Sequence, residues 1–248
     1  MVIEHVEYGK KKLIMKWTGV TCIALALVLS IIVLFTNSWQ TSDDSNISFG
    51  LNSVAIDCSD NNQWMGECTD EFNAILFADE WGEWEGERFE STELKSLRGP
   101  LKQFCINYPR VFLEWESAWT GGNTNESVKA AEHTEQECLV TNSAGNAGGI
   151  VILLGVIGAM FGTVLMVTAN IGKTLPSNVE RFGRISGWIS GSLIILGCLI
   201  WMQMKSEPLP YGYDLGISFY LAIIAGLLAI GAGFLDMLEN DKNPDEDD

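Results

Sequence analysis

Residues 148–171 read GGIVILLGVIGAMFGTVLMVTANI, a run with no charged side chain. A helix of roughly 20 apolar residues crosses a hydrocarbon core about 30 Å thick, so this run is long enough to span a bilayer. Three further runs meet the same requirement, and none has an Asp, Glu, Lys or Arg in its interior: 17–35, 185–204 and 215–235. Such segments insert at little cost in free energy. The sequence predicts a membrane α-helical protein, a bundle of four transmembrane helices.

The composition agrees with this division into apolar runs and charged remainder. The chain has 248 residues, is 47% hydrophobic and carries a formal net charge of −17. A disordered acidic chain would not contain 25 aromatic residues, and a soluble acidic domain would not be this apolar. The acidic balance also excludes a nucleic-acid binder, which needs a cationic surface to neutralise phosphates. Lipid is therefore the first expected partner.

The basic residues predict the orientation of the chain. Lysines 10, 11, 12 and 16 precede the first run, and Lys173, Arg181 and Arg184 lie between the second and third, whereas the loop 205–214 has only Lys205. Cytoplasmic loops are enriched in Lys and Arg, so both termini are expected in the cytoplasm of a multi-pass protein of the cell membrane. The first run exceeds the usual 7–15 residues of a signal-peptide core and no A-x-A site follows it, which favours an uncleaved helix.

The expected organisation follows from these runs. It is a cytoplasmic N-terminus 1–12, helix 13–36, extracellular domain 37–147, helix 148–171, cytoplasmic loop 172–184, helix 185–204, extracellular loop 205–214, helix 215–238 and an acidic cytoplasmic tail 239–248.

The segment 37–147 is expected to be a disulfide-tied, mixed α/β extracellular domain. It holds 20 acidic against 6 basic residues and four cysteines: Cys58, Cys68, Cys105 and Cys138. An even number of cysteines on the oxidising side predicts two disulfides, for which three pairings exist. Pairing 58 with 68 and 105 with 138 is favoured because each bond then closes a local loop, and the other pairings stay open. Cys22 and Cys198 lie in the spans and are expected to be buried, apolar side chains.

Hydrophobic periodicity suggests local structure within this domain. Alternation at Ile47, Phe49 and Leu51 resumes out of phase at Val54, Ile56 and Cys58, which predicts a bulge or a turn between two strands near Asn52-Ser53. A short helix capped by Thr69 is expected after Cys68. Residues 101–108 and 111–119 look helical with an interruption at Pro109, and 121–125 form a loop.

Cofactor and metal sites are not expected. No cysteine pair has C-x-x-C spacing and the only external histidine is His133, so zinc is disfavoured. The acidic and aromatic run 79–87 lacks the register of a calcium loop, and is interpreted as a solvated face, although weak divalent-cation binding stays open. Glycosylation sequons occur at Asn46 and Asn125.

The order of these features resembles the claudin / peripheral myelin protein superfamily. The resemblance begins with Trp39, Gly50-Leu51, Cys58 and Cys68, similar to the family's W…G-L-W…C…C signature, and extends to 66–76, to Arg184 with Gly187 and Gly191, and to 212–221. It implies a claudin-like fold with a bond between Cys58 and Cys68. Asn52 replaces the second tryptophan, the loop is about twice the usual length, and Cys105 and Cys138 have no counterpart. Because fold alone does not fix function, the resemblance transfers function only weakly.

Small residues recur at four-residue spacing at Gly158 and Gly162, and at Gly183, Gly187 and Gly191. Such ridges let helix backbones approach closely, and packing within one bundle is favoured over dimer contacts. The spans lack the interior ionisable residues typical of transporters, and His5 and His133 fall on opposite sides of the membrane, so no enzyme is expected. Two functions are carried forward: a structural, adhesive or cell-surface interaction role of the acidic extracellular domain, or an auxiliary subunit of a membrane channel, transporter or enzyme.

Overall fold

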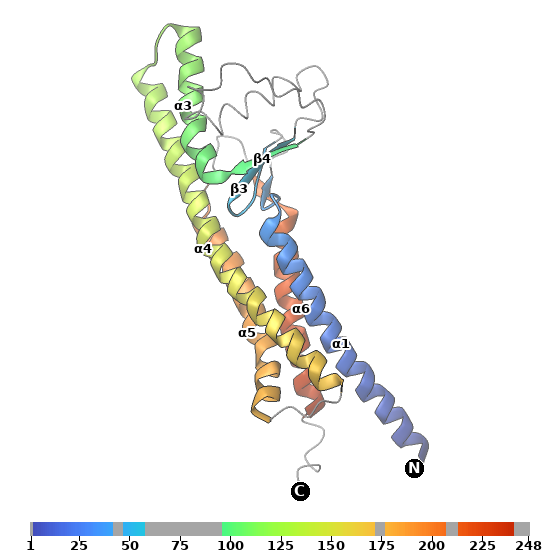
Figure 1. Cartoon of the computed structure of the whole chain (residues 1–248). Helices are drawn as coiled ribbons and strands as arrows, with labels where there is room; N and C mark the ends of the chain where they lie inside the picture. The colour runs from blue at the N-terminus through green and yellow to red at the C-terminus, as the bar shows by residue number, and fades with distance from the viewer. Residues whose placement is uncertain (1, 42–46, 58–95, 172–176, 207–212, 241–248) are drawn as a thin grey trace, which may run out of the picture. The chain divides into compact units, whose positions relative to one another are not determined.

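The protein is described here by a computed structural model covering residues 2–41, 47–57, 96–171, 177–206 and 213–240 (Figure 1). Most of these residues are helical: α1 (Val2–Phe35), α3 (Leu101–Thr120), α4 (Asn125–Asn170), α5 (Ser177–Met204) and α6 (Ile217–Asn240). Within those ranges, four helices are long and apolar enough to cross a membrane, at Trp17–Phe35, Asn125–Ala169, Ile185–Met204 and Ile217–Leu235. The expectation of a multi-pass membrane protein in contact with lipid is confirmed at this level.

The chain divides into two compact units. The helical unit comprises Met1–Leu34, Gly148–Ile200 and Phe219–Asp248, and the sheet unit comprises Phe35–Ala147 and Trp201–Ser218. Helices α1, α4, α5 and α6 each contribute to the helical unit, whereas α3 and all the strands belong to the sheet unit.

Glycines let the helices of the helical unit approach one another closely. A Cβ atom on Gly158 would meet Ser190 Oγ of α5, and one on Gly162 would meet Ser186 Oγ. On α5, a Cβ on Gly187 would lie 2.9 Å from the carbonyl oxygen of Ala229 in α6.

The other two glycines of the predicted ridges also face neighbours of this chain. Gly191 faces the backbone of Gly226, and Gly183 faces Leu165. The ridges thus pack α4 against α5 and α5 against α6, and Gly162 also faces Ile23 of α1.

The described part of the sheet unit contains a five-stranded antiparallel sheet in the order β4-β3-β2-β1-β5. Its strands are β1 (Gln40–Thr41), β2 (Ile47–Phe49), β3 (Ser53–Asp57), β4 (Ser96–Pro100) and β5 (Asp214–Leu215). The register change predicted near Asn52-Ser53 is a turn between β2 and β3, in which Gly50 N donates to Ser53 O at 2.7 Å. One side of the sheet packs against α3 through a core that includes Phe49, Val54, Leu101 and Phe104.

The helices α3 and α4 run side by side in opposite directions in the sheet unit, as Figure 1 shows. The predicted interruption at Pro109 is wrong, because α3 continues through it. A proline removes one backbone hydrogen bond from a helix, but Cys105 and Val111, on either side of Pro109, are both buried in the core and hold one helical path. The predicted loop after α3 is present, with Gly121 in the left-handed conformation at φ 79°.

Several helix boundaries differ from the sequence expectation. The first and third helices were predicted from residues 13 and 185, but α1 begins at Val2 and α5 at Ser177. The second apolar run, predicted from residue 148, is the later part of the 46-residue helix α4, which begins at Asn125. The fourth was predicted from Leu215, but Asp214 and Leu215 form β5 and pair with β1, so α6 begins at Ile217. Backbone pairing with another strand outweighs the apolar character of Leu215. The predicted helix after Cys68 lies outside the described residues.

Candidate functional site

Trp39 is an internal anchor of the sheet unit. Its side chain is fully buried and its ring meets that of Trp201 edge-on, with 5.0 Å between ring centroids. Its backbone N donates to Phe49 O of β2 at 2.9 Å, and its carbonyl accepts from Gly216 N beside β5 at 2.9 Å. The backbone of Trp39 therefore continues the pairing of β1 with β2 and β5, and its ring is buried in the interior.

The other residues of the family-like motif also have packing roles where they are described. Gly50 is buried, and a Cβ atom there would lie 2.8 Å from Thr36 O. Leu51 is buried and its carbonyl packs against Gly145 of α4 so closely that a side chain at Gly145 would collide with it. Cys58, Cys68 and the acidic run 79–87 lie outside the described residues.

A disulfide joins Cys105 of α3 to Cys138 of α4, with their Cα atoms 5.3 Å apart. This is the pairing that loop closure favoured for these two cysteines. Both cysteines are buried beside Phe49 and Tyr213, whose rings meet edge-on at 5.2 Å. The bond therefore joins α3 to α4 in the core that these helices share with the sheet.

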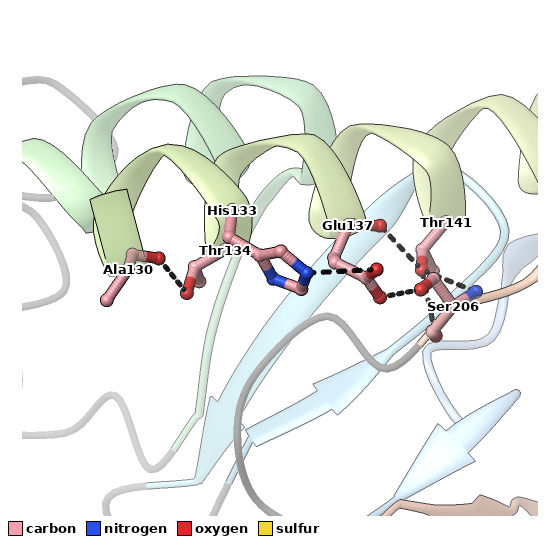
Figure 2. Close-up of polar contacts among 6 residues, drawn as sticks. All are labelled: Ala130, His133, Thr134, Glu137, Thr141 and Ser206. Carbon is pink, nitrogen blue, oxygen red and sulfur yellow. Dashed lines mark hydrogen bonds and ion pairs between the residues drawn. The ribbon is translucent and has the colours of Figure 1, made fainter. Parts of the chain in front are cut away.

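The structure also brings together a polar cluster that the sequence did not reveal, formed by Gln40, Glu137, Thr141 and Ser206. Figure 2 shows Glu137 and Thr141, one helical turn apart on α4, turned toward Ser206, which lies just after α5. Ser206 Oγ donates to Glu137 Oε2, and Ser206 N donates to Thr141 Oγ1 at 3.2 Å. Four residues from three separate parts of the chain thus meet at one point, which we call the Ser206 clasp.

The carbonyl of Ser206 is also bound. Thr141 Oγ1 lies 3.0 Å from Ser206 O and 3.3 Å from Glu137 O, and its single proton serves one of them at a time. Gln40 Nε2 reaches Ser206 O at 3.5 Å. Because Gln40 and Thr141 are buried, these bonds replace water that the groups would otherwise need. The clasp therefore satisfies Gln40 Nε2 and Thr141 Oγ1, whereas Gln40 Oε1 is buried without a hydrogen-bond partner among the described residues.

His133 extends the cluster to the surface. Its Nε2 lies 3.8 Å from Glu137 Oε1, an ion pair when the imidazole is protonated, and its side chain is 74% exposed. The carboxylate stands between the hydroxyl and the imidazole, which is not the order of a Ser–His–Asp triad, where the imidazole takes the proton of the hydroxyl. These contacts hold Ser206, just after α5, against α4. Over the described ranges, no group of three or more His, Cys, Asp or Glu side chains could hold a metal ion.

Among the described residues of the sheet unit, the α3–α4 hairpin has a largely exposed outer surface. It mixes charges of both signs with isolated apolar side chains, of which Phe112 is 52% and Val140 46% exposed. The exposed acidic and basic residues are Lys102, Arg110, Glu114, Glu126, Lys129, Glu132 and His133, and the exposed uncharged polar ones are Thr120, Asn123, Thr124, Asn125, Gln136, Ser143 and Asn146. The buried residues hold this hairpin together, and the exposed ones form its outer surface.

Sequence reasoning missed the clasp for a definite reason. The i, i+4 spacing of His133, Glu137 and Thr141 is visible in the sequence, and predicts a shared face once residues 125–147 are assigned as helix. Ser206 carries no such signal, because its partners lie 65 and 69 residues earlier in the chain. No known protein family and no curated protein matches the sequence.

Proposed function

We propose that the chain is a claudin-like integral membrane protein whose sheet unit lies outside the cell and carries a structural or adhesive role at the cell surface. The distribution of lysine and arginine supports this orientation, with both termini in the cytoplasm. The Cys105–Cys138 disulfide supports it too, because such bonds persist on the oxidising side of the membrane.

The observation that carries the proposal is that a disulfide and a buried core tie the α3–α4 hairpin together while its outer surface stays exposed. The disulfide lies in the buried core and the Ser206 clasp is partly buried, and both leave side chains such as Phe112 and Glu132 exposed. A surface fixed before binding loses less conformational entropy when it meets a partner. A pre-organised outer surface suits recognition between cells or with neighbouring surface molecules.

Vesicle clustering tests the adhesive role. The full chain is reconstituted into lipid vesicles, and protease digestion of a separate sample measures the fraction of protein with its sheet unit outward. Clustering of the undigested vesicles is followed by light scattering. We expect clustering that is lost when Phe112 and Glu132 are changed to Ser and Lys. A Ser143→Ala variant, exposed on α4 outside this pair, is the matched control. Vesicles that neither cluster nor show lateral association of the protein would overturn the adhesive proposal.

The second candidate is an auxiliary subunit of a membrane channel, transporter or enzyme. The observation that favours it is Ser192, which lies on the exposed face of α5 within an apolar span. A hydroxyl on such a face can hydrogen-bond to a helix of a neighbouring protein. Native-gel analysis of mild detergent extracts from the source membrane tests this: a hetero-complex that Ser192→Leu dissociates supports it, and migration as a monomer or homo-oligomer contradicts it.

A further inference from the structure

We infer that Asn125 is an acceptor for N-linked oligosaccharide, a site that rests on the proposed external position of the sheet unit. Asn125-Glu126-Ser127 is an N-x-S sequon at the first turn of α4, directly after the connection from α3. In the structure, Asn125 is exposed, the connection before it is open, and another residue caps the start of the helix.

The surroundings of Asn125 leave room for a bulky modification. Every residue from Thr120 to Glu126 is exposed. A Cβ atom added to Gly121 or Gly122 would meet no described atom within 4 Å, so the connection is open on that side. A helical rise of about 1.5 Å per residue places Asn125 about 33 Å along α4 from Ala147, the residue before the apolar run. The sequon is therefore well separated along the helix from the apolar run.

The helix start does not need the side chain of Asn125. Thr124 caps α4, because Ser127 N donates to Thr124 Oγ1 at 3.1 Å and Thr124 N donates to Ser127 Oγ at 3.0 Å. This reciprocal pair satisfies backbone donors that a helix start leaves open. Modification of Asn125 therefore leaves the cap intact, and the glycosylated chain can fold as the unmodified chain does.

The cap formed by Thr124 and Ser127 implies that the oligosaccharide is transferred before the helix start folds. The sequon hydroxyl of Ser127 is engaged by Thr124 in the folded protein, at 3.0 Å from both Thr124 N and Thr124 O. A transferase that reads this hydroxyl must act before the cap closes, while the segment is entering the external compartment. In that step Asn125 Nδ2 bonds to the anomeric carbon of a lipid-linked oligosaccharide. The bond from that carbon to the lipid phosphate oxygen breaks, the phosphate keeps the electron pair, and Nδ2 loses one proton.

Cell-free translation of the full chain with secretory microsomes tests the site. We expect a slower-migrating product that peptide N-glycosidase reverses, with Asn125 identified by mass spectrometry as the residue converted to Asp. Asn125→Gln and Ser127→Ala should abolish this modification. Asn123→Gln, an asparagine of the same turn outside any sequon, should keep it, and Thr124→Ala should keep it because the sequon survives without its cap partner.

An unmodified Asn125 would overturn the inference, as would loss of the modification in the Asn123→Gln or Thr124→Ala variant. Protease added outside the microsomes separates this failure from that of the proposed topology. A protected 37–147 fragment without sugar on Asn125 contradicts the inference alone, whereas a digested fragment contradicts the external position of the sheet unit as well.

Discussion

Ser206 uses its hydroxyl, its amide and its carbonyl in one contact with α4. Replacing Glu137 by Ala should remove the acceptor of the hydroxyl and destabilise the sheet unit by about 1–2 kcal/mol, the usual cost of losing such a bond. Thermal unfolding of detergent-solubilised protein, followed by near-ultraviolet circular dichroism, measures this. Glu132→Ala, an exposed carboxylate on the same helix, is the control and should stay within about 0.5 kcal/mol of the parent.

A double-mutant cycle decides whether Glu137 acts through Ser206. Residues in direct contact show coupling of roughly 0.5–3 kcal/mol. The combined Glu137→Ala and Ser206→Ala change should therefore cost less than the sum of the two single changes. Strict additivity would show that the two side chains contribute independently and would contradict the clasp.

Substitutions at Gly187 and Gly231 test whether helices pack through the small-residue ridges. A Cβ on Gly187 meets backbone atoms of Ala229 and Gly233, which cannot rotate away, whereas one on Gly231 meets nothing within 4 Å among the described residues. Gly187→Leu should destabilise the helical unit by about 1–3 kcal/mol, the usual cost of overpacking, and Gly231→Leu by about 0.5 kcal/mol or less. Equal midpoints of thermal aggregation in detergent would show that α5 and α6 do not pack through Gly187.

At the scale of elements, the disulfide closes a loop of the chain with a sequence separation of 33. Loop-closure entropy gives such a bond about 3–4 kcal/mol of stabilisation. Changing Cys105 and Cys138 together to Ser should lower the denaturant midpoint of the sheet unit and open the α3–α4 hairpin to limited proteolysis. A reductant should do the same to the parent and leave the double variant unchanged. An unchanged proteolysis pattern would mean that the core alone holds the hairpin.

The sequence predicts well those elements that have a long apolar run or a regular alternation of apolar residues. The apolar runs and the alternation at Ile47, Phe49, Val54 and Ile56 correspond to helices and to β2 and β3. The two-residue strands β1 and β5 have no pattern long enough to recognise, and form because distant backbone groups meet. Residues 125–147 are polar on much of their surface, so hydropathy alone did not mark them as part of α4. Pairing and packing between distant segments decide these remaining features.

At the scale of the whole molecule, the two compact units predict two separable responses to substitution. Hydrogen–deuterium exchange in detergent, read by mass spectrometry, reports both units in one experiment, because regions with their own contacts open with their own free energies. Glu137→Ala combined with Ser206→Ala should increase exchange in 96–147 and leave 185–200 unchanged, since the clasp lies wholly in the sheet unit. Gly187→Leu should do the reverse. A parallel increase in both regions for either variant would show that the chain opens as one cooperative unit.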